Sequence, residues 1–202
     1  MKGFAVAIIF VIINIIAATI FLIVTTTSIS SSILEEEKLS KEALERILEV
    51  YSNKNIASRA YYNAIVKIPK LDVYTVNALG NYISRVEKIE NDISLIEKPL
   101  TFQEYQYLQA RIQENINKIN YVARNYPTLR NDAGYIATRA NLTPIIEDEK
   151  SSIKTYNNHI IEYNKLTSNF PSNIVAGIMG KFPYLTFETG TNIIDKTELL
   201  FK

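Results

Sequence analysis

An uninterrupted apolar run near the amino terminus most limits the folds open to this chain. Residues 4–24 carry no charged side chain, and only Asn14 and Thr19 among them are polar. As a helix that rises about 1.5 Å per residue, the run would reach roughly 31 Å, which matches a hydrocarbon core of about 30 Å. We therefore expect residues 4–24 to form a transmembrane anchor in the lipid bilayer, preceded by a short flank of residues 1–3.

A cleaved secretory signal is the alternative interpretation, because Lys2 gives the chain a short basic start. The apolar run is long for a signal, however, and the Thr/Ser-rich stretch after it offers no Ala-x-Ala cleavage site. An uncleaved, single-pass anchor in the cell membrane is therefore the favoured prediction. Lys2 on one side is nearly balanced by Lys38 and Lys41 on the other, so the side on which the remaining chain lies is undetermined.

Beyond the apolar run, the spacing of apolar residues indicates helices. We expect a Thr/Ser-rich linker at residues 25–33, a helical bundle at residues 34–180 and an irregular tail at residues 181–202. Apolar side chains recur three or four positions apart over residues 34–67 and again over residues 76–97, which predicts two long helices. The first has a polar middle at which a kink is expected.

Capping residues and prolines predict where the later helices begin. Thr101 opens a Thr-x-x-Glu capping box, so a third helix should begin near Phe102. Pro127 should kink that helix, and Thr143 should cap a fourth helix with Pro144 at its first position. No alternation long enough for a sheet occurs. The predicted fold class is all-α: an N-terminal transmembrane helix followed by an antiparallel up-and-down bundle of three to four long helices.

A seven-residue repeat marks the predicted core face of the fourth helix. A Tyr-Asn pair recurs after seven positions, and a Phe-Pro pair follows seven positions later. This step is the a and d seam of a packed helix, which the proline should end. The two asparagines lie beside the seam, where their amides could bond a neighbouring helix or the backbone and set the register. The motif residues are Tyr156, Asn157, Tyr163, Asn164, Phe170 and Pro171, on a seam formed by Ile146, Glu149, Ile153, Tyr156, Ile160, Tyr163, Thr167 and Phe170.

Together with these pairs, the stretch Tyr126-Pro127-Thr-Leu129-Arg130 resembles the LemA family. The resemblance covers roughly residues 119–188 and rests on the order and spacing of the motifs as well as on the residue types. It implies a single-pass membrane protein with an N-terminal anchor and a long helical bundle. The molecular function of that family is poorly defined, so the resemblance supports fold and anchoring better than any activity.

The chain offers little material for catalysis or for cofactor binding. It has no cysteine, which excludes a disulfide, a thiolate nucleophile and a Cys-ligated metal. His159 is the single histidine, and Tyr156 stands where a Glu-x-x-His di-iron site needs its glutamate. No Gly-rich phosphate loop and no Gly-x-Ser-x-Gly motif is present. We therefore expect a non-enzymatic protein with no metal and no cofactor, in which His159 is a partly exposed interfacial residue.

Three function classes remain after these exclusions. The favoured one is a membrane-anchored helical scaffold or interaction protein that presents its bundle to protein partners or to copies of itself. A pilin-like filament subunit is the second, since Lys2-Gly3-Phe4 precedes an apolar helix, although Ile8 stands where the expected glutamate would be. A membrane-tethered helical sensor domain is the third. Nucleic acid is not an expected partner, because 22 Lys and Arg are balanced by 21 Asp and Glu.

Overall fold

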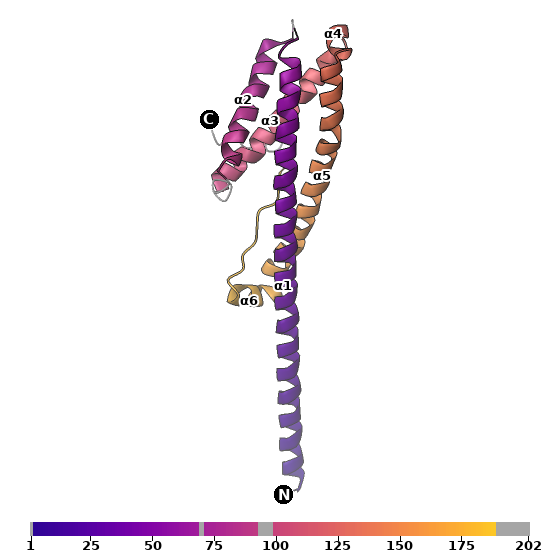
Figure 1. The fold of residues 1–202 in the computed structure, drawn as a ribbon. Helices are drawn as coiled ribbons and strands as arrows, with labels where there is room; N and C mark the ends of the chain where they lie inside the picture. Colours follow the sequence, from indigo (N-terminus) through magenta and orange to yellow (C-terminus); the bar gives the residue numbers. More distant parts are fainter. Residues whose placement is uncertain (1, 69–70, 93–98, 189–202) are drawn as a thin grey trace. The chain divides into compact units, whose positions relative to one another are not determined.

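A computed structural model describes residues 2–68, 71–92 and 99–188 of the 202. These residues form helices and connecting segments without any strand, which confirms the all-α prediction (Figure 1). The helices are α1 (Lys2–Ile65), α2 (Val73–Glu90), α3 (Pro99–Ala123), α4 (Pro127–Arg130), α5 (Ala133–Ser168) and α6 (Ser172–Ile178).

The first helix is longer than the sequence pattern predicts. Residues 25–33, which we expected to be a linker, continue α1 without a break, and so does the polar middle at residues 52–55. Thr25, Thr27 and Ser31 each donate a hydroxyl hydrogen bond to the carbonyl four residues earlier, at 2.6 to 2.7 Å. These bonds satisfy the hydroxyl groups within the helix itself, so polar residues here do not interrupt it.

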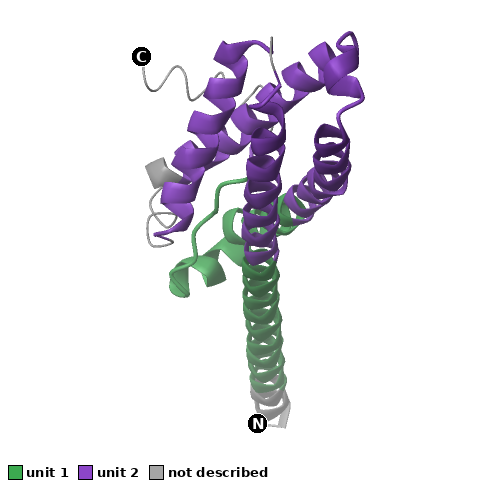
Figure 2. Ribbon diagram, turned by 45° about the horizontal axis from the view of Figure 1, so that its top comes forward, with its two compact units in different colours: residues 1–42, 156–186 green, residues 43–155, 187–202 purple. Residues whose placement is uncertain are grey.

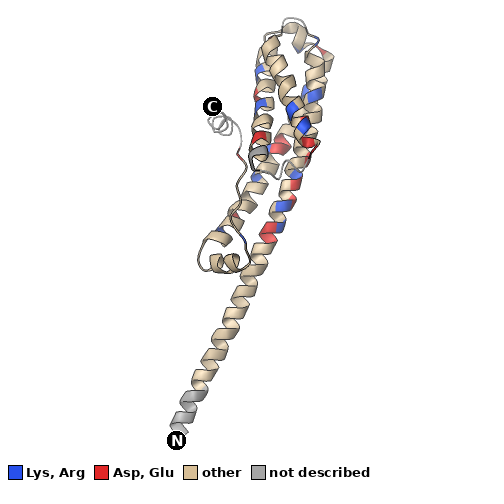
Figure 3. Ribbon diagram, turned by 90° about the vertical axis from the view of Figure 1, so that its left-hand side faces the viewer, with Lys and Arg blue, Asp and Glu red and all other residues tan. Residues whose placement is uncertain are grey.

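The amino-terminal part of α1 is apolar and uncovered by other described residues. Its large apolar side chains between Phe10 and Val24 are 50 to 72% exposed. In Figure 3 this part of the ribbon carries no charged residue, and charges begin at the Glu35 turn. Among the described residues, α1 is the one helix long and apolar enough to cross a membrane.

The chain divides into two compact units, each containing part of α1 and part of α5 (Figure 2). Unit 1 comprises residues 1–42 and 156–186, and unit 2 comprises residues 43–155 and 187–202. Unit 1 has a small core in which partly buried Ile29, Leu166 and Met179 pack against a fully or nearly fully buried cluster. That cluster is Ile33, Tyr163, Val175 and Ala176.

Unit 2 contains the larger core. The carboxyl-terminal half of α1, then α2, α3 and the first part of α5 run in alternating directions, as expected for an up-and-down bundle (Figure 1). One face of α2 buries an aliphatic stripe at a spacing of three or four residues: Val76, Leu79, Ile83, Val86 and Ile89. Gly80 allows α1 and α2 to approach closely, because a Cβ atom there would lie 2.8 Å from the Tyr62 ring.

Four predicted helix boundaries are wrong. Helix α3 begins at Pro99 and not near Phe102, so Thr101 lies within the helix instead of capping it. The chain breaks before Pro127 instead of merely kinking, because the residue before a proline is pushed out of the helical region and Tyr126 is extended, with φ −117° and ψ 94°. Helix α2 ends at Glu90, with Asn91 as its C-cap, which is earlier than the predicted end at residue 97; residues 93–98 lie outside the described residues.

The predicted start at Thr143 is the fourth wrong boundary. Pro144 lies inside α5, which began eleven residues earlier at Ala133. The Thr143 hydroxyl donates to the Arg139 carbonyl at 3.0 Å and therefore acts within the helix, not as a cap. Pro144 removes one backbone hydrogen bond, but the adjacent turn is held by packing, since Leu142 is only 1% exposed.

Candidate functional site

The family-motif residues of α5 lie in unit 1 and face its short carboxyl-terminal segment, residues 180–186. Tyr156 and Tyr163 are buried at 7 and 0% exposure, as a core seam requires. Ile153, Ile160 and Thr167 of the same seam are also buried, whereas Phe170 is 81% exposed. The seam prediction is therefore correct up to Thr167 and wrong at Phe170, because α5 ends at Ser168 and the helical spacing no longer orients that side chain.

Asn164 binds the backbone of the carboxyl-terminal segment through both ends of its amide. Its Nδ2 donates to the Tyr184 carbonyl at 2.9 Å, and its Oδ1 accepts from the Tyr184 N–H at 2.8 Å. This pairing satisfies the backbone groups of Tyr184 much as a neighbouring strand would. The asparagine thus bonds an extended segment of its own chain, and not another helix.

Two tyrosines of α5 also contact this segment. The rings of Tyr163 and Tyr184 are stacked, with centroids 4.9 Å apart and an interplanar angle of 17°. The Tyr156 hydroxyl donates to the Leu185 carbonyl at 3.2 Å. Burial raises the pKa of both Tyr156 and Tyr163 to about 12, so both hydroxyls remain protonated at neutral pH. We call Tyr156, Tyr163 and Asn164 together the segment clamp.

Charged residues of α1 complete the contacts in unit 1. Glu37 is nearly buried and accepts from Lys181 at 2.5 Å and from Lys41 at 3.0 Å. The hydrogen bond from Lys181 is the main reason that the pKa of Glu37 lies below its ordinary value. His159 is partly exposed, as predicted, and its Nδ1 lies 2.9 Å from Glu36.

The other motif residues have different positions. Pro171 occupies the N-cap position of α6 without a side-chain capping bond, and Asn157 is partly buried beside the seam. Tyr126 and Pro127 belong to unit 2, where they form the start of α4. The structure therefore brings the Tyr-Asn pairs together with the carboxyl-terminal segment and leaves the Tyr-Pro pair outside that site.

Unit 2 contains buried charges that the sequence analysis missed. The Lys54 side chain is fully buried and donates to Glu149 at 2.7 Å and to the Gln109 carbonyl at 3.3 Å. Glu90 accepts from Tyr105 at 2.8 Å and from Asn55 at 3.0 Å, and its burial raises its pKa. The sequence did contain an indication of the Lys54–Glu149 pair, because Glu149 is the one charged residue on a mostly apolar seam.

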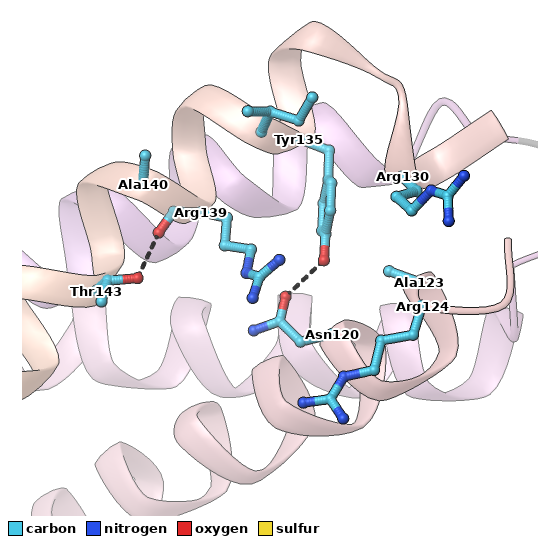
Figure 4. Close-up of a pocket in the computed structure, with 9 residues that line it drawn as sticks. Asn120, Ala123, Arg124, Arg130, Tyr135, Arg139, Ala140 and Thr143 are labelled. Atoms are coloured by element: carbon cyan, nitrogen blue, oxygen red, sulfur yellow. Dashed lines mark hydrogen bonds between the residues drawn. The ribbon is translucent and has the colours of Figure 1, made fainter. Parts of the chain in front are cut away.

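A pocket of about 370 Å³ lies in unit 2 between the end of α3, α4 and the start of α5. Asn120 is at its centre, and its Oδ1 accepts the hydroxyls of Tyr61 at 3.0 Å and of Tyr135 at 2.8 Å (Figure 4). Burial raises the pKa of both tyrosines, so both remain donors. The nine lining residues are Asn120, Ala123, Arg124, Arg130, Tyr135, Ile136, Arg139, Ala140 and Thr143.

The polar groups of the segment clamp and of the unit 2 pocket are of kinds that bind other groups through hydrogen bonds. Within residues 2–68, 71–92 and 99–188, no group of three or more His, Asp or Glu side chains is placed to hold a metal ion. Within the described residues, His159 lies beside Glu36 and forms no hydrogen bond to a serine or threonine hydroxyl. The segment clamp fixes a piece of backbone, and the unit 2 pocket presents arginine and amide groups.

The fold and these sites define an all-helical protein with an apolar N-terminal helix and no recognisable catalytic arrangement in its described part. A comparison with family models gives the finer assignment: the model of the LemA family matches residues 81–198. The chain therefore belongs to the LemA family. The sequence resemblance covered residues 119–188, and the family model matches a longer range that begins earlier. The matched range therefore includes residues of α2 and α3 in unit 2 as well as the segment clamp. A search of curated proteins found no match.

Proposed function

We propose that this chain is a membrane-anchored, non-catalytic helical scaffold or interaction protein that presents its helices to protein partners or to copies of itself. One observation carries the proposal. Helix α1 runs without interruption from an exposed apolar part, residues 10–24, into residues that are buried in the core of both units. In this proposal the same helix is both the anchor and a core helix.

The energetics of that helix support anchoring. Apolar side chains that stay 50% or more exposed in water lose the favourable free energy of burial, about 25 cal/mol for each Å². A bilayer removes the same surface from water, and residues at the centre of an apolar run each favour insertion by about 0.3 to 0.6 kcal/mol. Asn14 and Thr19 do not oppose this strongly, because both bond backbone carbonyls four residues earlier at 2.8 Å.

The anchoring part of the proposal is tested by extraction of membranes from cells that express the full chain. We expect the protein to remain in the membrane pellet after washing with alkaline carbonate, and a chain without residues 1–24 to be released. Recovery of the full chain in the soluble fraction would contradict the proposal. A mature amino terminus at Phe4, determined by intact mass, would instead favour the filament alternative.

The interaction part needs a separate readout. The chain has no cysteine, so a single cysteine placed at exposed Ser168 or Lys154 is a unique reporter. Cross-linking in intact membranes with a bifunctional thiol reagent should give a homodimer or a defined heteromeric adduct of reproducible mass. A chain that stays strictly monomeric at both positions would refute the scaffold role. A membrane-impermeant reagent at position 168 reports the side of the membrane in the same experiment.

A further inference from the structure

The arginines of the chain fall into two groups according to their partners. Four are paired with acidic residues at 2.6 to 2.8 Å: Arg46, Arg59, Arg85 and Arg111. The other three, Arg124, Arg130 and Arg139, form no ion pair with any residue that the structure describes, and all three line the unit 2 pocket. No carboxylate is among the lining residues of that pocket. The unit 2 pocket is therefore electropositive.

The remaining polar groups of the pocket also favour an anion. The Asn120 Oδ1 is occupied by two tyrosine hydroxyls, so the amide nitrogen is the end available as a donor. In Figure 4 the Arg139 guanidinium group points toward this amide, and Arg124 and Arg130 extend from the neighbouring segments. Both of those arginines are exposed, and their long side chains can reorient onto a bound group.

We propose that this pocket binds the phosphate or carboxylate group of a small organic anion. Arginine recognises such groups with two parallel hydrogen bonds, which a planar guanidinium group provides better than an ammonium group. The apolar part of the ligand would contact Ala123, Ile136 and Ala140, which supply the non-polar lining. The ligand is thus an anion with an attached apolar or ring portion, either free in solution or as a lipid headgroup.

Titration of the full chain in nanodiscs of zwitterionic lipid tests this proposal, with phenyl phosphate and inorganic phosphate as probes in isothermal calorimetry. We expect saturable binding of both, with phenyl phosphate bound more tightly. The double variant Arg124→Gln/Arg130→Gln and the single variant Arg139→Gln should each raise Kd by about tenfold or more. Lys154→Gln is the matched control, because it removes one exposed positive charge outside the pocket and should leave Kd unchanged.

Two results would overturn the proposal: no binding of either probe, or equal loss of binding in Lys154→Gln and in the arginine variants. Circular dichroism establishes that each variant keeps its helices. Nanodiscs that contain anionic lipid distinguish the two sources of the ligand. Competition with phenyl phosphate by the anionic lipid assigns the pocket to a headgroup, and unchanged binding assigns it to a soluble anion.

A separate observation in unit 1 concerns α6 and its flanks. The inner side of α6 buries Val175 and Ala176 against a core that includes Ile29 and Ile33 of α1. The outer side is apolar too, although no described residue covers it. Its exposed fractions are 81% for Phe170, 56% for Ile174, 82% for Ile178 and 71% for Phe182. No charged residue occurs from position 166 to position 180.

The position of α6 within unit 1 places this surface close to the end of the apolar run. Ile29 and Ile33 follow Val24 by five and nine residues, which is about 7.5 and 13.5 Å along a helix. The headgroup layer of a bilayer extends about 5 to 8 Å beyond the hydrocarbon on each side, so Ile29 falls within this layer and Ile33 lies outside it. Figure 1 shows the axis of α6 roughly perpendicular to that of α1, so α6 would run roughly along the plane of a bilayer that α1 crosses.

We infer that the outer surface of α6, formed by Phe170, Ile174, Ile178 and Phe182, lies in the headgroup region of the bilayer. Apolar side chains at this depth are removed from water at the boundary with the acyl chains. This inference rests on the proposed membrane anchor. It adds a second lipid contact, which would fix the angle and rotation of α1 relative to the membrane.

A fluorescent probe attached to a single cysteine at position 178 tests the inference in liposomes. We expect an emission shift to shorter wavelength and quenching by lipids brominated near the headgroup. The same probe at position 154 is the control, because Lys154 is exposed and polar, and should show neither change. Ile174→Ser, with the probe kept at position 178, should reduce the quenching.

The possible failures are distinguishable. A chain that resists carbonate extraction but shows no bromine quenching at position 178 would overturn this inference and leave the proposed anchor intact. An emission shift to shorter wavelength without bromine quenching would mean that a second copy of the chain covers α6. That result would also overturn the inference. Release of the chain by carbonate would contradict the proposed anchor itself.

Discussion

Units 1 and 2 each contain a stretch of α1 and a stretch of α5, yet they use these helices differently. In unit 1, α5 directs tyrosine and asparagine side chains at an extended segment and fixes its backbone through the segment clamp. In unit 2, the same two helices pack with α2 and α3, and their polar groups bond one another across a core, as at Lys54 and Glu149. The buried charge of unit 2 has no counterpart in the clamp, which bonds neutral backbone groups.

This difference has a consequence for stability. A fully buried ammonium group is costly when its partner is lost, whereas a partly exposed amide that loses a backbone contact can bond water instead. We therefore expect substitutions at the polar contacts of unit 2 to affect global unfolding, and those in unit 1 to affect mainly the carboxyl-terminal segment. The following experiments test this contrast.

Loss of the Glu149 carboxylate should have the largest effect. Glu149→Leu leaves buried Lys54 without its anionic partner and should lower the free energy of unfolding by about 3 kcal/mol. The double variant Lys54→Met/Glu149→Leu should recover most of this loss, since no charge remains buried. Urea unfolding of the full chain in mild detergent, followed by circular dichroism, measures both. If Glu149→Leu is as stable as the double variant, an unpaired buried Lys54 is not the cause of the loss of stability.

Asn120→Leu should be the next most destabilising change. It removes the acceptor of two tyrosine hydroxyls, those of Tyr61 and Tyr135, and should cost about 2 kcal/mol in the same unfolding experiment. The triple variant Asn120→Leu/Tyr61→Phe/Tyr135→Phe removes the donors as well and should be more stable than Asn120→Leu. If the triple variant is less stable than the single one, unpaired hydroxyls are not the cause.

In unit 1, Asn164→Ala should cost about 1 kcal/mol and act locally. It removes both hydrogen bonds to Tyr184, so hydrogen exchange at residues 180–186 should become faster while exchange in α2 and α3 stays unchanged. Asn158→Ala is the matched control on the exposed side of α5. Equal acceleration in α2 and α3 would contradict the local role of the clamp.

Protonation of Glu37 in unit 1 should have the smallest of these effects. The Lys181 hydrogen bond lowers the pKa of Glu37 below 4.5, so ionised Glu37 stabilises the folded state at neutral pH, and this contribution is lost as the pH falls below about 4.5. The protection factors at residues 180–186, which are corrected for the slower intrinsic exchange in acid, should therefore fall from pH 5.5 to pH 3.5. Glu37→Gln should abolish this dependence on pH, and its persistence in that variant would assign it to another group.

The contrast between the units also determines which features were predictable. The aliphatic stripe of α2 and the seam of α5 up to Thr167 follow from spacing alone, because a helix repeats every 3.6 residues wherever it packs. Phe170 was placed on the seam wrongly because the spacing has no meaning after α5 ends. The helix breaks before Pro127 but continues through Pro144 for a tertiary reason. Packing at Leu142 holds α5 together, whereas Tyr126 adopts the extended backbone that proline favours.

The candidate sites were predictable only in part. The Tyr-Asn pairs were identified from their repeat, but the segment that they bind is 20 to 29 residues away and carries no matching pattern. The arginine pocket was not identified, because its lining comes from three helices and the connection after α3, over 24 residues of chain. The sequence alone does not show which arginines lack an acidic partner in the folded protein.

The sequence by itself determined the apolar N-terminal helix, the helical class of the chain and the apolar faces of its long helices, since these depend on backbone geometry and on residues a few positions apart. Tertiary structure alone decided the partners of the polar groups: Glu149 for Lys54, the Tyr184 backbone for Asn164, and no acidic partner within the described chain for the three pocket arginines. Such pairings join residues up to 144 positions apart, as for Glu37 and Lys181, and depend on which groups the folded chain removes from water.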